Sequence, residues 1–187
     1  LDAYGGLLGG NRSYIKYRVD LRNYVTMFKH ITFASRINGG LISGWSNDYD
    51  QYEAILFEKF YLGGSNTLRA IRPLRLLNYN NDSYDNDGDG LIDEEDEDKN
   101  TPSGKEIMVL TNLELRFPIL WEIGGVLFFD GGNIYGESKN INIESLVWNY
   151  GVALTLNLPV GPLRIDFARD SIDPKIYQIQ LGFLYAF

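Results

Sequence analysis

Trp148-Asn-Tyr-Gly-Val-Ala-Leu-Thr-Leu-Asn-Leu158 alternates between large apolar side chains and small or polar ones over its whole length. Successive side chains of a β-strand point to opposite faces of a sheet, so this stretch predicts a strand with one apolar and one polar face. A tilted strand of about 9–11 residues crosses a lipid bilayer. The stretch is therefore long enough to span a membrane.

The same alternation recurs in other stretches of the chain. Between residues 13 and 24, for example, Val19 and Leu21 fall on one face, while Asp20 and Arg22 fall on the other. We predict strands at about residues 13–24, 30–42, 107–117, 123–130, 147–158, 163–169 and 176–187. Glycine-rich residues 1–12 are predicted to be a loop, and further loops are predicted at about 44–104 and 131–146.

Two features favour a membrane barrel over a soluble β-sandwich. Short connections, such as about 25–29 and 118–122, alternate with long ones, and outer-membrane barrels have short periplasmic turns and long external loops. The apolar faces are also rich in aromatic residues. The charged faces would then line the lumen, either as a solvated channel wall or as a binding surface for an inserted segment. The inward side chains would be Lys16, Arg18, Asp20, Arg22, Arg36, Glu114, Arg116, Asp130, Arg164 and Asp166.

The strand count and the composition limit the possible functions. Seven strands would leave a sheet edge open in lipid, so we expect this chain to be the C-terminal part of a larger barrel. A net charge of -8 argues against nucleic-acid binding. The chain has no cysteine, which excludes thiol chemistry, and its one histidine, His30, has no evident nucleophile beside it. We therefore do not expect an enzyme. No signal peptide is visible at Leu1, so an exported protein would begin upstream.

Four short motifs follow one another along the chain. They are Phe60-Tyr-Leu-Gly-Gly-Ser-Asn-Thr-Leu-Arg69, Asn112-Leu-Glu-Leu-Arg-Phe-Pro118, Phe128-Phe-Asp-Gly-Gly132 and Val160-Gly-Pro-Leu-Arg-Ile-Asp-Phe167. In this order they resemble the sixth loop and the following strands of the Omp85 superfamily, which includes BamA, TamA and the surface-antigen barrels. The resemblance implies an all-β fold, an antiparallel transmembrane β-barrel of about 16 strands. This chain would supply the C-terminal seven or eight strands, with the long loop folded into the lumen.

The loop arginine of this family pairs with inward acids on the two strands that follow. By position, the resemblance implies that Arg69 pairs with Glu114 and Asp130, and the alternation independently places both acids in the lumen. The alternative is that Arg69 is a solvated loop residue. The family's Arg-Gly-aromatic sequence is replaced here by Arg69-Ala70-Ile71, so the loop tip is expected to turn differently. The loop motif comprises Gly63, Gly64, Leu68, Ala70 and Ile71.

The end of the chain resembles the outer-membrane β-signal. Gln180-Leu-Gly-Phe-Leu-Tyr-Ala-Phe187 has a polar residue, a glycine and two aromatic residues at the expected spacing. Members of the family use a weak seam between their first and last strands, and a glycine in the last strand would weaken it. The signal residues are Gln180, Gly182, Tyr185 and Phe187.

The long loop contains an acidic segment, Asp85-Asn-Asp-Gly-Asp-Gly-Leu-Ile-Asp-Glu-Glu-Asp96. Its acids have the spacing of a calcium loop, with Gly90 at the sharp turn, and oxygen ligands at this spacing suit Ca2+. The twelfth position is an aspartate rather than the usual glutamate, so the affinity is expected to be modest. The alternative is a disordered acidic tract. The expected ligands of a structural Ca2+ are Asp85, Asp87, Asp89, Leu91, Asp93 and Asp96.

The resemblance implies assembly, insertion or translocation of outer-membrane proteins, without nucleotide hydrolysis. The expected location is the bacterial outer membrane. The expected partners are outer-membrane lipid, unfolded outer-membrane protein clients, periplasmic chaperones, accessory lipoproteins and POTRA domains upstream in the full-length chain. The alternative is a passive outer-membrane channel, or a surface-exposed binding barrel stabilised by calcium.

Overall fold

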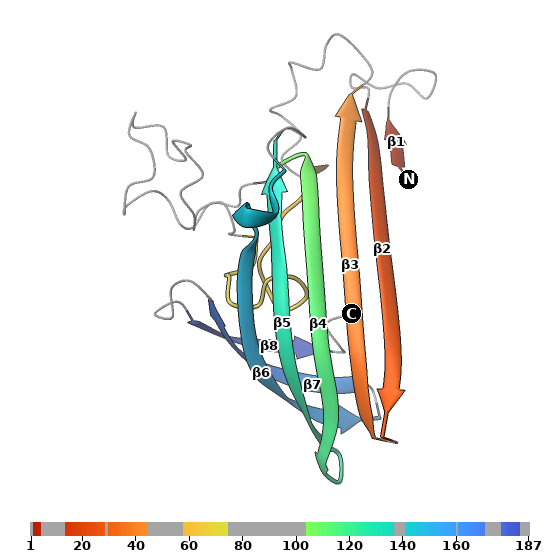
Figure 1. Ribbon diagram of the computed structural model, residues 1–187, viewed down its shortest axis with the longest axis vertical. Helices are drawn as coiled ribbons and strands as arrows, with labels where there is room; N and C mark the ends of the chain where they lie inside the picture. The colour runs from red at the N-terminus through yellow and green to blue at the C-terminus, as the bar shows by residue number, and fades with distance from the viewer. Residues whose placement is uncertain are drawn as a thin grey trace.

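The computed structural model describes residues 2–4, 14–28, 30–44, 58–74, 104–136, 141–159, 161–170 and 177–183. Within these ranges the chain forms one antiparallel sheet whose eight strands are ordered as in the sequence, from β1 to β8 (Figure 1). No helix of the described ranges is long and apolar enough to cross a membrane. The elements are β1 (Asp2–Tyr4), β2 (Tyr14–Met27), β3 (Ile31–Gly44), β4 (Ile107–Leu120), β5 (Ile123–Tyr135), the 3-10 helix η6 (Ile143–Ser145), β6 (Val147–Leu158), β7 (Gly161–Asp170) and β8 (Tyr177–Phe183).

The predicted all-β antiparallel fold is confirmed, and β6 has the predicted bounds. The predicted short turns at about 25–29 and 118–122 start too early, because β2 continues to Met27 and β4 to Leu120. Two predicted loops were also wrong in part. Asp2–Tyr4 is not loop but a short strand paired with β2, and β5 continues through Gly131 and Gly132 to Tyr135. The loop was predicted to begin at Gly131, but Gly131 pairs with Trp148 on β6. A Cβ atom at Gly131 would lie 2.2 Å from the Trp148 ring, so glycine makes room for an aromatic neighbour within the strand.

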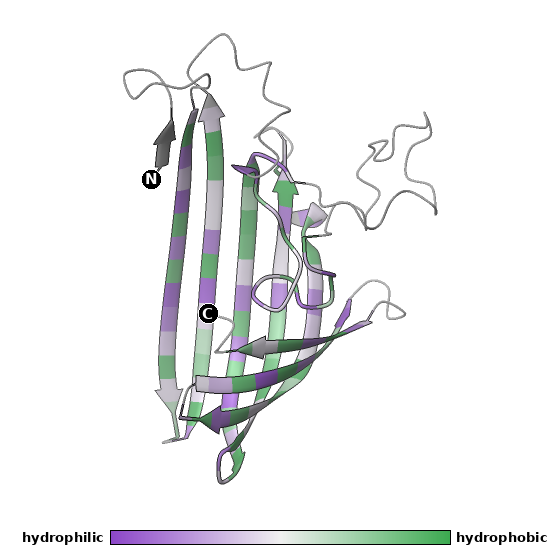
Figure 2. Cartoon of the chain, turned by 180° about the vertical axis from the view of Figure 1, so that it is seen from behind, coloured by the Kyte–Doolittle hydropathy of each residue, from purple (hydrophilic) through white to green (hydrophobic). Residues whose placement is uncertain are grey.

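Alternation sorts the side chains of every long strand onto two faces. Figure 2 shows hydrophilic and hydrophobic residues alternating along the strands. Apolar residues on the outer face are exposed, for example Leu21, Ile37, Leu154 and Ile179. Such a surface suits contact with lipid. The inner face carries a polar row that crosses the sheet in register from β2 to β7, formed by Arg22, Arg36, Asn112, Asp130, Asn149 and Asp170.

The sheet is strongly curved, and the segment 58–74 lies inside the curve. In Figure 1, β2 to β5 run side by side while β6 to β8 turn away from them, and Figure 2 shows the segment against the concave face. Its Leu62, Leu68 and Ile71 are fully buried in one cluster with Met108 and Leu110 of β4. The principal apolar core of the described residues therefore lies between this loop and the inner face of the sheet.

Candidate functional site: the loop inside the curved sheet

The loop enters the concave face through a short pairing with the residues just before β4. Phe60 forms an isolated antiparallel bridge with Lys105. The Phe60 ring then packs on Gly40 of β3, where an added Cβ atom would come within 2.3 Å of the ring. The ammonium of Lys16 lies 4.8 Å from the centre of the same ring. These contacts fix the point at which the chain enters the concave face.

The glycine pair allows the loop to reverse tightly. Gly63 and Gly64 have φ angles of +112° and +104°, a region that residues with a Cβ atom rarely adopt. A Cβ atom at Gly63 would also lie 2.1 Å from the carbonyl oxygen of Arg72. The Gly64 amide donates to the carbonyls of Leu68 and Ile71, at 3.2 and 3.0 Å. The result is a compact turn that presents residues 65–71 to the sheet.

Arg69 lies at the centre of this turn and is fully buried. Its Nε and Nη2 atoms donate to the two carboxylate oxygens of Asp130 on β5, at 2.8 and 2.6 Å. Its Nη1 atom donates to Glu114 on β4, at 2.5 Å. The guanidinium lies 3.6 Å from the centre of the Phe128 ring. The structure thus brings together the three residues that the resemblance paired, and Arg69 is not a solvated loop residue.

The two acids differ in their remaining partners. Glu114 also accepts a hydrogen bond from Arg116, at 2.8 Å, so it faces two cations. Asp130 accepts a further bond from the neutral amide of Asn112, at 2.8 Å. Burial alone would lower the pKa of the Arg69 guanidinium, but Asp130 and then Glu114 outweigh it and raise that pKa above its ordinary value. Arg69 therefore carries a permanent charge, whose principal counter-ion is Asp130.

The backbone carbonyls of the loop are also bound by side chains of the sheet. Arg164 of β7 donates to Ser65, at 2.8 Å. Arg36 of β3 donates to Asn66, at 3.1 Å, and Asn112 of β4 to Thr67, at 2.8 Å. Alternation had predicted that Arg36 and Arg164 face inward, and both are buried on the inner face. Their loop partners were missed, because a bond to a backbone carbonyl leaves no mark on the residue type of the acceptor.

Alanine is accommodated at position 70. The residues with positive φ in the loop are Gly63, Gly64 and Leu74, and Ala70 is outside that set. Its methyl group is buried in a small cluster with Val126, Phe128, Ala153 and Ala168. The next residue, Ile71, fills the larger cluster beneath the loop. The departure from the family motif therefore places two buried apolar side chains at the loop tip without backbone strain at Ala70.

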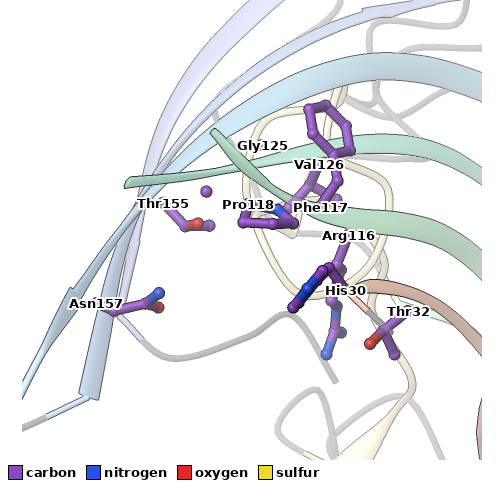
Figure 3. Close-up of a pocket in the computed structure, with 10 residues that line it drawn as sticks. His30, Thr32, Arg116, Phe117, Pro118, Gly125, Val126, Thr155 and Asn157 are labelled. Carbon is purple, nitrogen blue, oxygen red and sulfur yellow. The ribbon is translucent and has the colours of Figure 1, made fainter. Parts of the chain in front are cut away.

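A cavity of about 420 Å³ lies at the short-turn end of the inner face (Figure 3). Its lining includes His30 from the turn after β2, Arg116 from β4 and Thr155 and Asn157 from β6. Arg116 is bound to Glu114, which balances its charge. None of the described residues that line the cavity with His30 is a carboxylate.

Several predicted site residues lie outside the described ranges. These are the calcium-loop residues Asp85, Asp87, Asp89, Leu91, Asp93 and Asp96, and the aromatic signal residues Tyr185 and Phe187. Within the ranges that the structure does describe, no group of three or more His, Cys, Asp or Glu residues is placed to hold a metal ion. Gln180 and Gly182 lie on β8, at positions paired with the inward-facing Asp166 and Arg164 of β7.

Comparisons with known proteins show the family to which this fold belongs. The Omp85 superfamily domain model matches residues 1–187. The outer membrane protein assembly factor BamA of Nitratidesulfovibrio vulgaris (strain Hildenborough) is 27% identical over 166 residues, which cover 87% of this chain and 18% of that relative. The structure of BamA from Haemophilus ducreyi lacking POTRA domains 1–3 matches with a TM-score of 0.65 and 17% identity, over 94% of this chain and 35% of that one.

The solved structure and the family model support different conclusions. At 17% identity, the solved structure shows a shared fold alone. The chain also spans much less than two thirds of either relative. The family match, in contrast, extends over every residue of the chain. The chain therefore belongs to the Omp85 superfamily, whose BamA members are β-barrel proteins of the bacterial outer membrane.

Proposed function

We propose that this chain is the barrel part of a factor that assembles or inserts outer-membrane proteins without nucleotide hydrolysis. Family membership and the likeness to a BamA assembly factor support this function. The observation that carries the proposal is the loop held inside the sheet by the buried Arg69–Glu114–Asp130 ion pairs. A loop fixed in this way occupies the concave face and leaves the sheet edges for pairing.

The proposed mechanism uses the edge of the sheet rather than bond chemistry. In the described sheet β8 pairs with β7 and ends the strand order. An edge strand presents unpaired backbone groups, and an incoming client strand would add to it by β-augmentation. In this proposal the seam lies between β8 and a first strand. Proposed partners are outer-membrane lipid, unfolded clients, periplasmic chaperones, accessory lipoproteins and upstream POTRA domains.

Conditional depletion of the protein in its source bacterium tests this function. We expect the outer-membrane levels of several unrelated barrels to fall before growth stops, and a wild-type copy to restore them. Unchanged barrel levels after complete depletion would refute the proposal. The passive-channel alternative predicts instead a steady conductance of the purified full-length protein in a planar bilayer. The loop that occupies the concave face favours low conductance until it is displaced.

We also propose that residues 85–96 bind a structural Ca2+ in the long external loop. The support is the ligand spacing in the sequence, with acids at alternate positions and Gly90 at the turn. Terbium luminescence of the full-length protein, excited through nearby aromatic residues, would report binding. Asp85→Asn together with Asp89→Asn should abolish a signal that excess Ca2+ displaces. Absence of any displaceable signal in the wild-type protein would disprove the site.

A further inference from the structure

Gln180 links the last described strand to the loop tip. Its side-chain Nε2 atom donates to the carbonyl oxygen of Arg69, at 2.7 Å, and to that of Ile71, at 3.1 Å. A glutamine amide has two N–H groups, so both donors are used. The two acceptors flank Ala70, one of the two residues at which this chain departs from the family motif. Arg69 and Ile71 are fully buried. Loss of Gln180 would take this donor from the Arg69 carbonyl, while the Ile71 carbonyl would keep the Gly64 amide.

A second contact holds the other side of the loop to the same end of the sheet. Arg164 of β7 donates from Nη2 to the carbonyl of Ser65, at 2.8 Å. Its guanidinium passes over Gly182 of β8, where an added Cβ atom would lie 3.1 Å from Nη2. Packing within this chain therefore explains the glycine at position 182, because it leaves room for the arginine that reaches the loop.

The opposite side of the loop is bound to other strands. Arg36 and Asn112 bind the carbonyls of Asn66 and Thr67 from β3 and β4, and the Arg69 side chain binds β4 and β5. The loop thus spans the concave face from β3–β5 to β7–β8, and the figures show it between these strands. In the described ranges β8 has β7 as its strand partner, while outward Ile179, Leu181 and Phe183 are exposed.

We propose that the loop fixes the position of the edge strand β8, and that Gln180 is the residue that couples them. When its two hydrogen bonds break, β8 is free to move away from the loop while Arg69 stays bound to Glu114 and Asp130. The state of the loop would thereby set how readily the edge opens. The inference deepens the proposed function, because it rests on that edge being where clients pair.

A groove between the two elements supplies a matched control. This groove, of about 480 Å³, is lined by residues 63–67 and 178–181 together with Pro73. Gln178 lies on the same strand, two residues from Gln180 and on the same face. It makes no hydrogen bond to the described loop residues in the contacts of this structure. Gln178→Leu therefore repeats the chemical change of Gln180→Leu without removing a bond to the loop.

Hydrogen–deuterium exchange of the full-length protein in lipid nanodiscs tests the proposal. Removing two hydrogen bonds of ordinary strength should speed amide exchange by about 10- to 100-fold. We expect this acceleration in β8 of Gln180→Leu, with β4 and β5 unchanged and Gln178→Leu like the wild type. Unchanged exchange in β8, equal acceleration in both variants, or equal acceleration of all strands would overturn the proposal.

A milder variant and a separate readout keep the result interpretable. If Gln180→Leu does not assemble, Gln180→Asn shortens the side chain by one methylene and should accelerate β8 exchange to a smaller extent. The exchange experiment requires no client. If β8 is unaffected, the coupling fails whatever depletion does to other barrels. If depletion has no effect while β8 exchange responds, the coupling stands and the proposed function fails.

Discussion

Replacement of Arg69 by alanine is expected to release the loop from the concave face. The substitution removes the guanidinium from Asp130 and Glu114, and all three residues are buried. Breaking a buried ion pair by removing one partner costs about 3–5 kcal/mol, because a charge is left uncompensated. That cost corresponds to an increase of about two to four orders of magnitude in the population of the open loop.

A cysteine at position 70 would measure this opening. Residues 1–187 contain no cysteine, so Ala70→Cys adds the single thiol of this part of the protein, at a buried loop position. In membranes, the rate at which a small thiol reagent labels this cysteine reports the population of the open loop. Adding Arg69→Ala should raise the rate by at least about a hundredfold over Ala70→Cys alone.

The unequal surroundings of the two acids give a second, sharper expectation. Without Arg69, Asp130 retains the neutral Asn112, while Glu114 retains Arg116. Adding Asp130→Asn to Arg69→Ala should therefore slow labelling again, because it removes the unpaired charge. Adding Glu114→Gln should not slow labelling, because it removes the carboxylate that binds Arg116. The reasoning would be refuted if Arg69→Ala left the labelling rate unchanged. It would also be refuted if Asp130→Asn and Glu114→Gln slowed the labelling of the Arg69→Ala protein equally.

Three further substitutions test separate parts of the structure. Gly63→Ala forces a Cβ atom to within 2.1 Å of the Arg72 carbonyl at a φ of +112°, and should destabilise the loop by about 1–3 kcal/mol. External protease would then cleave the loop faster, and unchanged resistance would speak against the tight turn. Ala70→Gly should lower the free energy of unfolding in urea by about 0.5–1 kcal/mol, since position 70 needs no positive φ; a gain would show that the backbone there is strained. Trp121→Gly, at a turn position with φ +47° and a side chain 90% exposed, should raise that free energy by up to about 1 kcal/mol. A lower free energy of unfolding would mean that contact of Trp121 with the membrane interface stabilises the protein.

The alternation of side chains was sufficient to predict the faces of the strands. A period of two assigns every residue of a strand to one side, so Glu114, Asp130, Arg164 and Asp166 could be placed inside before any coordinates. Their pairing with a loop residue could not be derived in this way. Arg69 lies 45 and 61 residues from its two acids, and only the family resemblance indicated that they meet.

Contacts to backbone and glycine positions were the least predictable. Gln180 binds carbonyls 111 and 109 residues away, and any residue type supplies a carbonyl. Gly131 was predicted to begin a loop, yet it lies inside a strand, where it makes room for the Trp148 ring. In both cases the physical reason lies in a distant neighbour rather than in the local sequence.

Reconstitution tests the central claim most directly. The full-length protein would be incorporated into liposomes, and an unfolded outer-membrane barrel would be added without nucleotide. The insertion of this client would be followed by its protection from protease. The account predicts insertion markedly faster than in empty liposomes. It predicts slower insertion when Arg69→Ala releases the loop, because the loop then no longer holds β8 in position to pair with a client strand. Insertion at the same rate in empty liposomes, in wild-type liposomes and in Arg69→Ala liposomes would contradict it.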